Sequence, residues 1–109
     1  MKPRRRVETT AVDTEKLVRT LKRLRPALEA EGVSRLVVFG SRATGTAGPQ
    51  SDLDIAIDVV PEARFSILDL IGVEHLLTDA TGISANAFML RSLDAPFRAE
   101  VDRKGIAVF

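Results

Sequence analysis

Two short motifs in the first half of this 109-residue chain have the chemistry of a nucleotide site. The segment Gly40-Ser41-Arg42-Ala43-Thr44-Gly45 is a small, flexible turn, and Ser51-Asp52-Leu53-Asp54 follows it with two closely spaced carboxylates. Backbone N–H groups of a glycine-serine turn can bind phosphate oxygens, and two neighbouring carboxylates can hold Mg²⁺. Each motif alone is common. Together, between two strand-like segments, they indicate chemistry on a nucleotide.

The two carboxylates are predicted at the start of a strand, where they can act together. Residues two apart on a strand point the same way, with Cα atoms about 6.6 Å apart, so Asp52 and Asp54 can converge on one ion. A turn or capping role is the alternative, but Asp54 lies in an otherwise apolar run, where an unpaired carboxylate is costly. We therefore predict that Asp52 and Asp54 are catalytic metal ligands, and that Gly40, Ser41 and Arg42 bind the nucleotide. For Arg42, a solvent-facing side chain fits the pattern equally well.

The spacing of apolar residues predicts the elements that position these motifs. Helical periodicity indicates helices at 13–24, 26–31, 66–79 and 94–103, and a short helix opening at Ser41. Short β-branched or alternating runs indicate strands at 34–39, 52–60 and 83–90, and a strand or extended tail at 105–109. This order predicts an α/β (α+β) fold with a small mixed β-sheet and helices packed mainly on one face.

Composition and charge narrow the function classes. The net charge of +1 argues against a protein built mainly to bind nucleic acid, but basic residues gather at the start of the chain. We predict a flexible basic N-terminal arm at 1–12, through which nucleic acid is an alternative partner, and one domain at 13–109. The absence of cysteine excludes disulfides and thiolate metal sites. No apolar run approaches a membrane span and no secretory signal is evident, so we expect a cytoplasmic protein without a membrane partner.

The motif residues also resemble those of a known family. The segment Phe39-Gly40-Ser41-Arg42-Ala43-x-Gly45, followed by Ser51-Asp52-x-Asp54, resembles the signature of the nucleotidyltransferase superfamily that includes DNA polymerase beta. The short chain with N-terminal helices is similar to its minimal nucleotidyltransferases, small bacterial proteins often paired with a HEPN-domain protein.

This resemblance implies a nucleotidyltransferase fold and a reaction. A nucleoside monophosphate would pass from a nucleoside triphosphate, with ATP expected, to a hydroxyl, and pyrophosphate would be released. Gly40 and Ser41 would contact the triphosphate, and Asp52 and Asp54 would hold Mg²⁺. The resemblance further implies an antitoxin whose acceptor is a HEPN-type helical protein partner.

One position departs from the family pattern. Family members usually carry a third carboxylate on the next strand, and the matching run Ala85-Asn86-Ala87-Phe88 has Asn86 there. Asparagine keeps one carbonyl ligand but lacks the charge and cannot accept a proton. Asp58 lies about 13 Å along the strand from Asp54, too far to replace the missing acid. The sequence therefore leaves three readings open: an active nucleotidyltransferase, a degenerate binding module that neutralises a partner without turnover, and a subunit whose helical partner completes the site.

Overall fold

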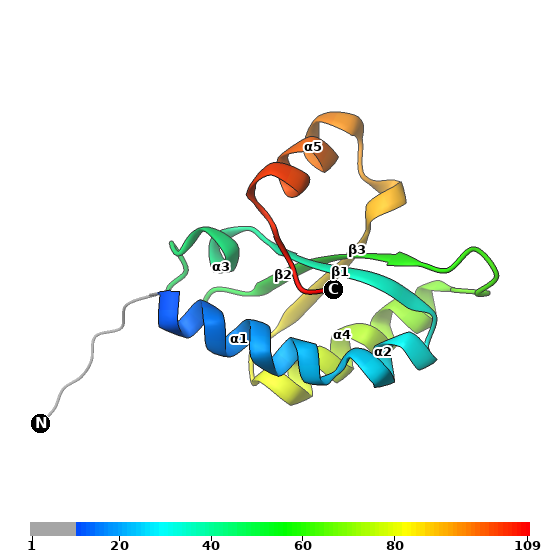
Figure 1. Cartoon of the computed structure of the whole chain (residues 1–109), viewed down its shortest axis with the longest axis horizontal. Helices are drawn as coiled ribbons and strands as arrows, with labels where there is room; N and C mark the ends of the chain where they lie inside the picture. The colour runs from blue at the N-terminus through cyan, green and yellow to red at the C-terminus, as the bar shows by residue number, and fades with distance from the viewer. Residues whose placement is uncertain (1–10) are drawn as a thin grey trace, which may run out of the picture.

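A four-stranded mixed sheet organises residues 11–109, the part of the chain that the computed structural model describes (Figure 1). Its strands lie in the order β3-β2-β1-β4. β1 pairs antiparallel with both β2 and β4, whereas β3 runs parallel to β2. The bounds are β1 Val33–Phe39, β2 Leu53–Val59, β3 Ala85–Met89 and β4 Ile106–Ala107. The predicted strands overlap all four.

The helices also follow the predicted order. Their bounds are α1 Ala11–Arg23, α2 Arg25–Ala30, α3 Ser41–Thr44, α4 Ile67–Thr81 and α5 Ala95–Lys104, with a 3₁₀ turn at Leu90–Ser92 that the sequence analysis did not predict. α1 begins at Ala11, inside the predicted 1–12 arm. The rest of that arm, residues 1–10, lies outside the described residues.

Most of the helical surface packs on one face of the sheet. α1, α2 and α4 lie together on the same side in Figure 1. Their buried leucines and valines meet the face of the sheet that carries the odd-numbered β2 residues. The buried members from the helices are Leu17, Leu21, Leu28, Val73 and Leu77, and those from the two central strands include Leu36, Val38, Leu53, Ile55 and Ile57. Burial of this apolar surface is the main force holding the fold together.

The opposite face carries a smaller apolar cluster and the polar residues of interest. α5 and the 3₁₀ turn pack there, where Val101 and Leu90 meet Val37, Phe39 and Ala56. Figure 1 shows α5 on the other side of the sheet from α1, α2 and α4. The predicted small mixed sheet with helices mainly on one face is therefore confirmed.

α4 has sharp ends that fix its position beside β3. Ser66 and Asp69 form a capping box at its start, in which each side chain bonds the backbone N–H of the other residue. Gly82 ends the helix with φ +73°, a left-handed conformation that favours glycine. Among residues 11–109, no helix is long and apolar enough to cross a membrane.

Candidate functional site

Asp54 and Asn86 meet on the face of the sheet opposite α4. In the strand register, Phe39 on β1 pairs with Asp54 on β2, which pairs with Asn86 on β3. Asp52 lies two residues earlier, just before β2 begins. Since residues two apart share a face, both aspartates extend toward Asn86, as the alternation in the sequence predicts.

The amide of Asn86 joins the two carboxylates. Its Nδ2 donates to Asp52 Oδ2 at 3.2 Å and to Asp54 Oδ1 at 3.3 Å. One oxygen from each carboxylate therefore converges on a single point beside Asn86. In this arrangement the amide N–H₂ occupies the place where a cation would neutralise both charges.

The oxygen ligands at this point fit one Mg²⁺ ion but not two. Mg²⁺ in proteins is commonly bound by one or two carboxylates, with substrate phosphates and water completing the shell. Asp52 and Asp54 meet that requirement for one ion. Within residues 11–109, no group of three or more histidine, cysteine, aspartate or glutamate side chains is arranged to hold a metal. The third carboxylate that would help hold a second ion is therefore missing from the described part of the chain.

Gly40 brings the glycine-serine turn directly against Asp54. It adopts φ +73°, and a Cβ built at this position would lie 2.8 Å from Asp54 Oδ2. Both the backbone conformation and the space therefore require glycine. Gly40 O accepts the first hydrogen bonds of α3, from the N–H groups of Ala43 and Thr44. The N–H groups of Ser41 and Arg42 come earlier in the helix and therefore have no acceptor within it. Two free donors thus adjoin the carboxylates.

Arg42 braces the loop that leads into Asp52. Its Nη2 donates to Ser51 O at 2.6 Å and to Gly48 O at 3.5 Å. Ser51 Oγ in turn accepts from Gly48 N at 2.9 Å, which closes a turn immediately before Asp52. The side chain is half-buried rather than freely solvated. A contact between Arg42 and phosphate stays a prediction, while its contacts with the loop give it a positioning function.

A cavity of about 340 Å³ opens beside Gly40, between α3 and α5. Phe39, Thr44, Phe97 and Lys104 are among the residues that line it. Phe39 packs edge-to-face against Phe97, with ring centroids 5.7 Å apart, and Phe97 remains 40% exposed. The carboxylate site therefore adjoins a space with an aromatic wall.

Sequence reasoning missed the side chains that anchor β3. β3 is an edge strand, and two of its backbone N–H groups bond to side chains of α4 instead of another strand. Ala85 N donates to Thr78 Oγ1 at 3.0 Å, and Ala87 N donates to Glu74 Oε2 at 2.8 Å. Asn86 lies between these two anchored residues. The signal in the sequence was the spacing of Glu74 and Thr78, four residues apart on one helix face.

The anchor predicts a local effect on strand β3. In Glu74→Ala, exchange of the Ala87 amide hydrogen should accelerate about tenfold or more, because a hydrogen bond to a charged acceptor contributes roughly 1.5–3 kcal/mol. Native-state hydrogen exchange followed by NMR measures this rate. Glu74→Gln retains an acceptor oxygen and should lie between the two. Asp79→Ala, at an exposed site on the same helix, is the control; an unchanged Ala87 rate in Glu74→Ala would contradict the anchor.

Comparisons of the sequence and the fold with known proteins identify related domains. A family model described as a nucleotidyltransferase domain matches residues 15–101. No curated protein matches the sequence. Among solved structures, a protein described as a minimal nucleotidyltransferase is 29% identical, with a TM-score of 0.71, over 85% of this chain and 93% of that one.

Two toxin–antitoxin structures share the fold at lower identity. One is a toxin–antitoxin crystal structure with AMP-PNP. It is 21% identical, with a TM-score of 0.68, and the match covers 83% of this chain and 72% of that one. The other contains a tri-AMPylated HEPN toxin from Shewanella oneidensis in complex with an MNT antitoxin. It is 16% identical, with a TM-score of 0.64, and the match covers 88% of this chain and 71% of that one. At these identities the likeness shows the fold.

Proposed function

The chain belongs to the nucleotidyltransferase domain family, and on that premise we propose that it transfers a nucleoside monophosphate from a nucleoside triphosphate to a hydroxyl, with Mg²⁺ as cofactor. The observation that carries the proposal is the convergence of Asp52 and Asp54 on one point, directly beside the turn at Gly40 and Ser41. A cation ligand pair and unpaired backbone donors are what a metal-bound triphosphate requires.

Each group has a part in this proposed reaction. Asp52 and Asp54 would hold one Mg²⁺, which supplies charge neutralisation at the phosphates when bound. The N–H groups of Ser41 and Arg42 would donate to phosphate oxygens. The cavity beside Phe97 would take the nucleoside. A bond forms between the acceptor oxygen and the α-phosphorus, the bond from that phosphorus to the bridging oxygen breaks, and pyrophosphate leaves.

We expect removal of the proton from the attacking hydroxyl to be the slow step at this site. Asn86 cannot accept the proton of the attacking hydroxyl, so that proton must pass to solvent or to one of the two aspartates. Both aspartates are already engaged by the cation in this scheme. We therefore expect slow transfer, with nucleotide binding less affected than turnover.

We further propose that ATP is the donor and that a HEPN-type protein is the acceptor, as in an antitoxin of a toxin–antitoxin pair. Support comes from the neighbours, one solved with AMP-PNP and one with an AMPylated HEPN toxin. The chain also exposes apolar residues at the start of α4: Ile67 is 67% and Leu68 is 74% exposed. Apolar surface of this kind is often covered by a partner protein. A cytoplasmic location, where ATP and such partners occur, is part of the proposal.

The second candidate function is a binding module that neutralises its partner without turnover. Asn86 is the observation that favours it, because its amide already satisfies both carboxylates. In this case the protein would retain the fold and the partner surface, and the site would bind nucleotide weakly or without consequence.

Transfer of radiolabel separates the two candidates. The purified protein is incubated with α-labelled ATP, Mg²⁺ and a candidate HEPN-type partner, and label on the partner is measured after gel separation. The enzyme proposal expects label with the wild type and none with Asp54→Asn. Label that appears only with Asn86→Asp, or partner binding without label from either protein, would support the binding module and overturn the enzyme.

A further inference from the structure

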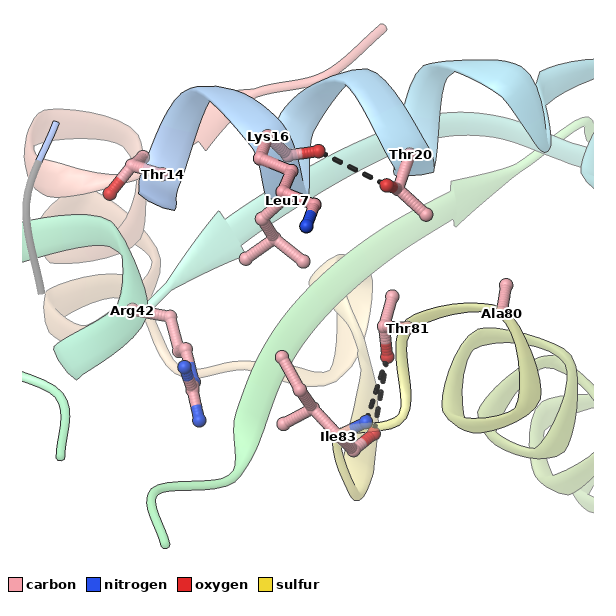
Figure 2. A pocket seen from close by; sticks show the side chains of 8 residues that line it. All are labelled: Thr14, Lys16, Leu17, Thr20, Arg42, Ala80, Thr81 and Ile83. Atoms are coloured by element: carbon pink, nitrogen blue, oxygen red, sulfur yellow. Dashed lines mark hydrogen bonds between the residues drawn. The ribbon is translucent and has the colours of Figure 1, made fainter. Parts of the chain in front are cut away.

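A second cavity, of about 330 Å³, lies between α1, the end of α4 and the side chain of Arg42 (Figure 2). Gly40, Asp52, Asp54 and Asn86 do not line it. It is therefore separate from the candidate nucleotide site, although Arg42 adjoins both. Its volume is within the range of small-molecule sites.

The described residues that line this cavity carry positive charge. Lys16 on α1 and Arg42 on α3 contribute two cationic side chains, and none of the described lining residues is acidic. Thr14, Thr20 and Thr81 add three hydroxyls. In Figure 2, the α1 residues face Arg42 and Thr81 across the space. The two cationic side chains are donors that suit an anion with several oxygens.

The two cations retain unused donor capacity. Arg42 Nε is buried and has no hydrogen-bond partner within the described residues, although Nη2 of the same guanidinium bonds to Ser51 O and Gly48 O. Lys16 has no ion-pair partner among the side chains of residues 14–109. A buried donor without a partner is costly in a folded protein, so a rearrangement of the Arg42 side chain that gives Nε an acceptor is favourable.

The negative end of α4 does not cancel this charge. Thr81 Oγ1 donates to Leu77 O, and Gly82 N donates to Thr78 O, so these carbonyls at the helix end already have partners. The effect of a helix terminus is also smaller than that of two full positive charges at comparable distance. The cavity therefore remains a cationic environment.

We propose that this cavity binds a small phosphorylated molecule, with the phosphate between Lys16 and Arg42. Leu17, Ala80 and Ile83 provide the apolar remainder of the lining and would contact the body of the ligand. Phosphate is favoured over a carboxylate because the two cationic side chains come from different elements, α1 and α3, rather than presenting their donors in one plane. The proposal does not depend on the transferase activity, since the two sites use different ligands and only share Arg42.

NMR titration of the full chain in metal-free buffer tests the proposal. The probes are inorganic phosphate and ribose 5-phosphate, added at constant ionic strength with sodium chloride as the reference. Both should produce saturable shifts of the Thr14, Thr20 and Thr81 amides in the millimolar range, and ribose 5-phosphate should bind more tightly because of the apolar lining. Shifts confined to Gly40 and Ser41, or no saturable change with either probe, would overturn the proposal.

A matched pair of variants gives the second readout. Lys16 and Lys22 are exposed on the same helix, and only Lys16 lines the cavity. Lys16→Gln should weaken both probes about fivefold to tenfold, while Lys22→Gln should leave their affinities unchanged. Because both positions are exposed, neither substitution is expected to unfold the protein. Equal affinities in the two variants would show general charge attraction and refute a built site.

Discussion

An Asn86→Asp variant is expected to bind Mg²⁺ at least tenfold more tightly than the wild type and to lose stability when the metal is removed. The wild-type amide donates to Asp52 and Asp54, and the substitution replaces this donor with a third negative charge. Losing hydrogen bonds to charged acceptors costs roughly 1.5–3 kcal/mol, and adjacent like charges repel. A divalent cation would reverse both effects.

Thermal unfolding with and without Mg²⁺ measures both the loss of stability and its reversal by the metal. For a domain of this size, about 2 kcal/mol corresponds to a fall in Tm of roughly 10 °C in metal-free buffer. Millimolar Mg²⁺ should restore most of that loss, because a ligand of the native state stabilises it by mass action. Calorimetric titration gives the affinity directly. Asn86→Ala is the matched control, since it removes the amide without adding charge and should gain no metal affinity.

The Asn86→Asp variant also tests whether the missing carboxylate limits the rate of transfer. If the missing carboxylate limits the transfer reaction, Asn86→Asp should increase the rate of label transfer by about two orders of magnitude, the usual contribution of a positioned general base. Equal Mg²⁺ affinity and equal stability in the wild type and the variant would show that Asn86 does not occupy the metal position, and the proposed site would be wrong.

An Asp54→Asn variant should lose metal-dependent nucleotide binding, by about a hundredfold or more in affinity. Asp54 is half-buried and contributes one of the two oxygens that converge beside Asn86. Asparagine has the same size but no charge, so the fold is retained while one Mg²⁺ ligand is weakened. A hundredfold loss corresponds to about 2.7 kcal/mol. The measurement is the Tm increase on adding Mg²⁺ and ATP together, which should disappear.

Asp58→Asn provides the control for this prediction. Asp58 is on the same strand and the same face as Asp54, about 13 Å further along, and pairs with Arg35 in the register. It should keep the full Tm increase with Mg²⁺ and ATP. If Asp54→Asn also kept it, the cation would have to bind elsewhere in the molecule.

The residue pattern alone was sufficient to predict the fold class and to identify the family. Strand alternation placed Asp52 and Asp54 on one face, and the glycine-serine pattern predicted a turn at Gly40 and Ser41, because these signals are local and depend on spacing within a few residues. Helix and strand types were predicted well for the same reason. The boundaries differed by one or two residues, as at the start of α1, because end residues respond to tertiary contacts.

Only the tertiary structure decided what lies around those motifs. Sequence comparison could suggest that Asn86 replaces a carboxylate, but not that its amide bonds both aspartates across two strands. Glu74 bonds to Ala87 N on the edge of β3, a contact that its position in the sequence does not reveal. The cavity of Lys16 and Arg42 joins residues far apart in the chain. Such contacts are set by how helices pack on the sheet, which no periodicity within a single segment encodes.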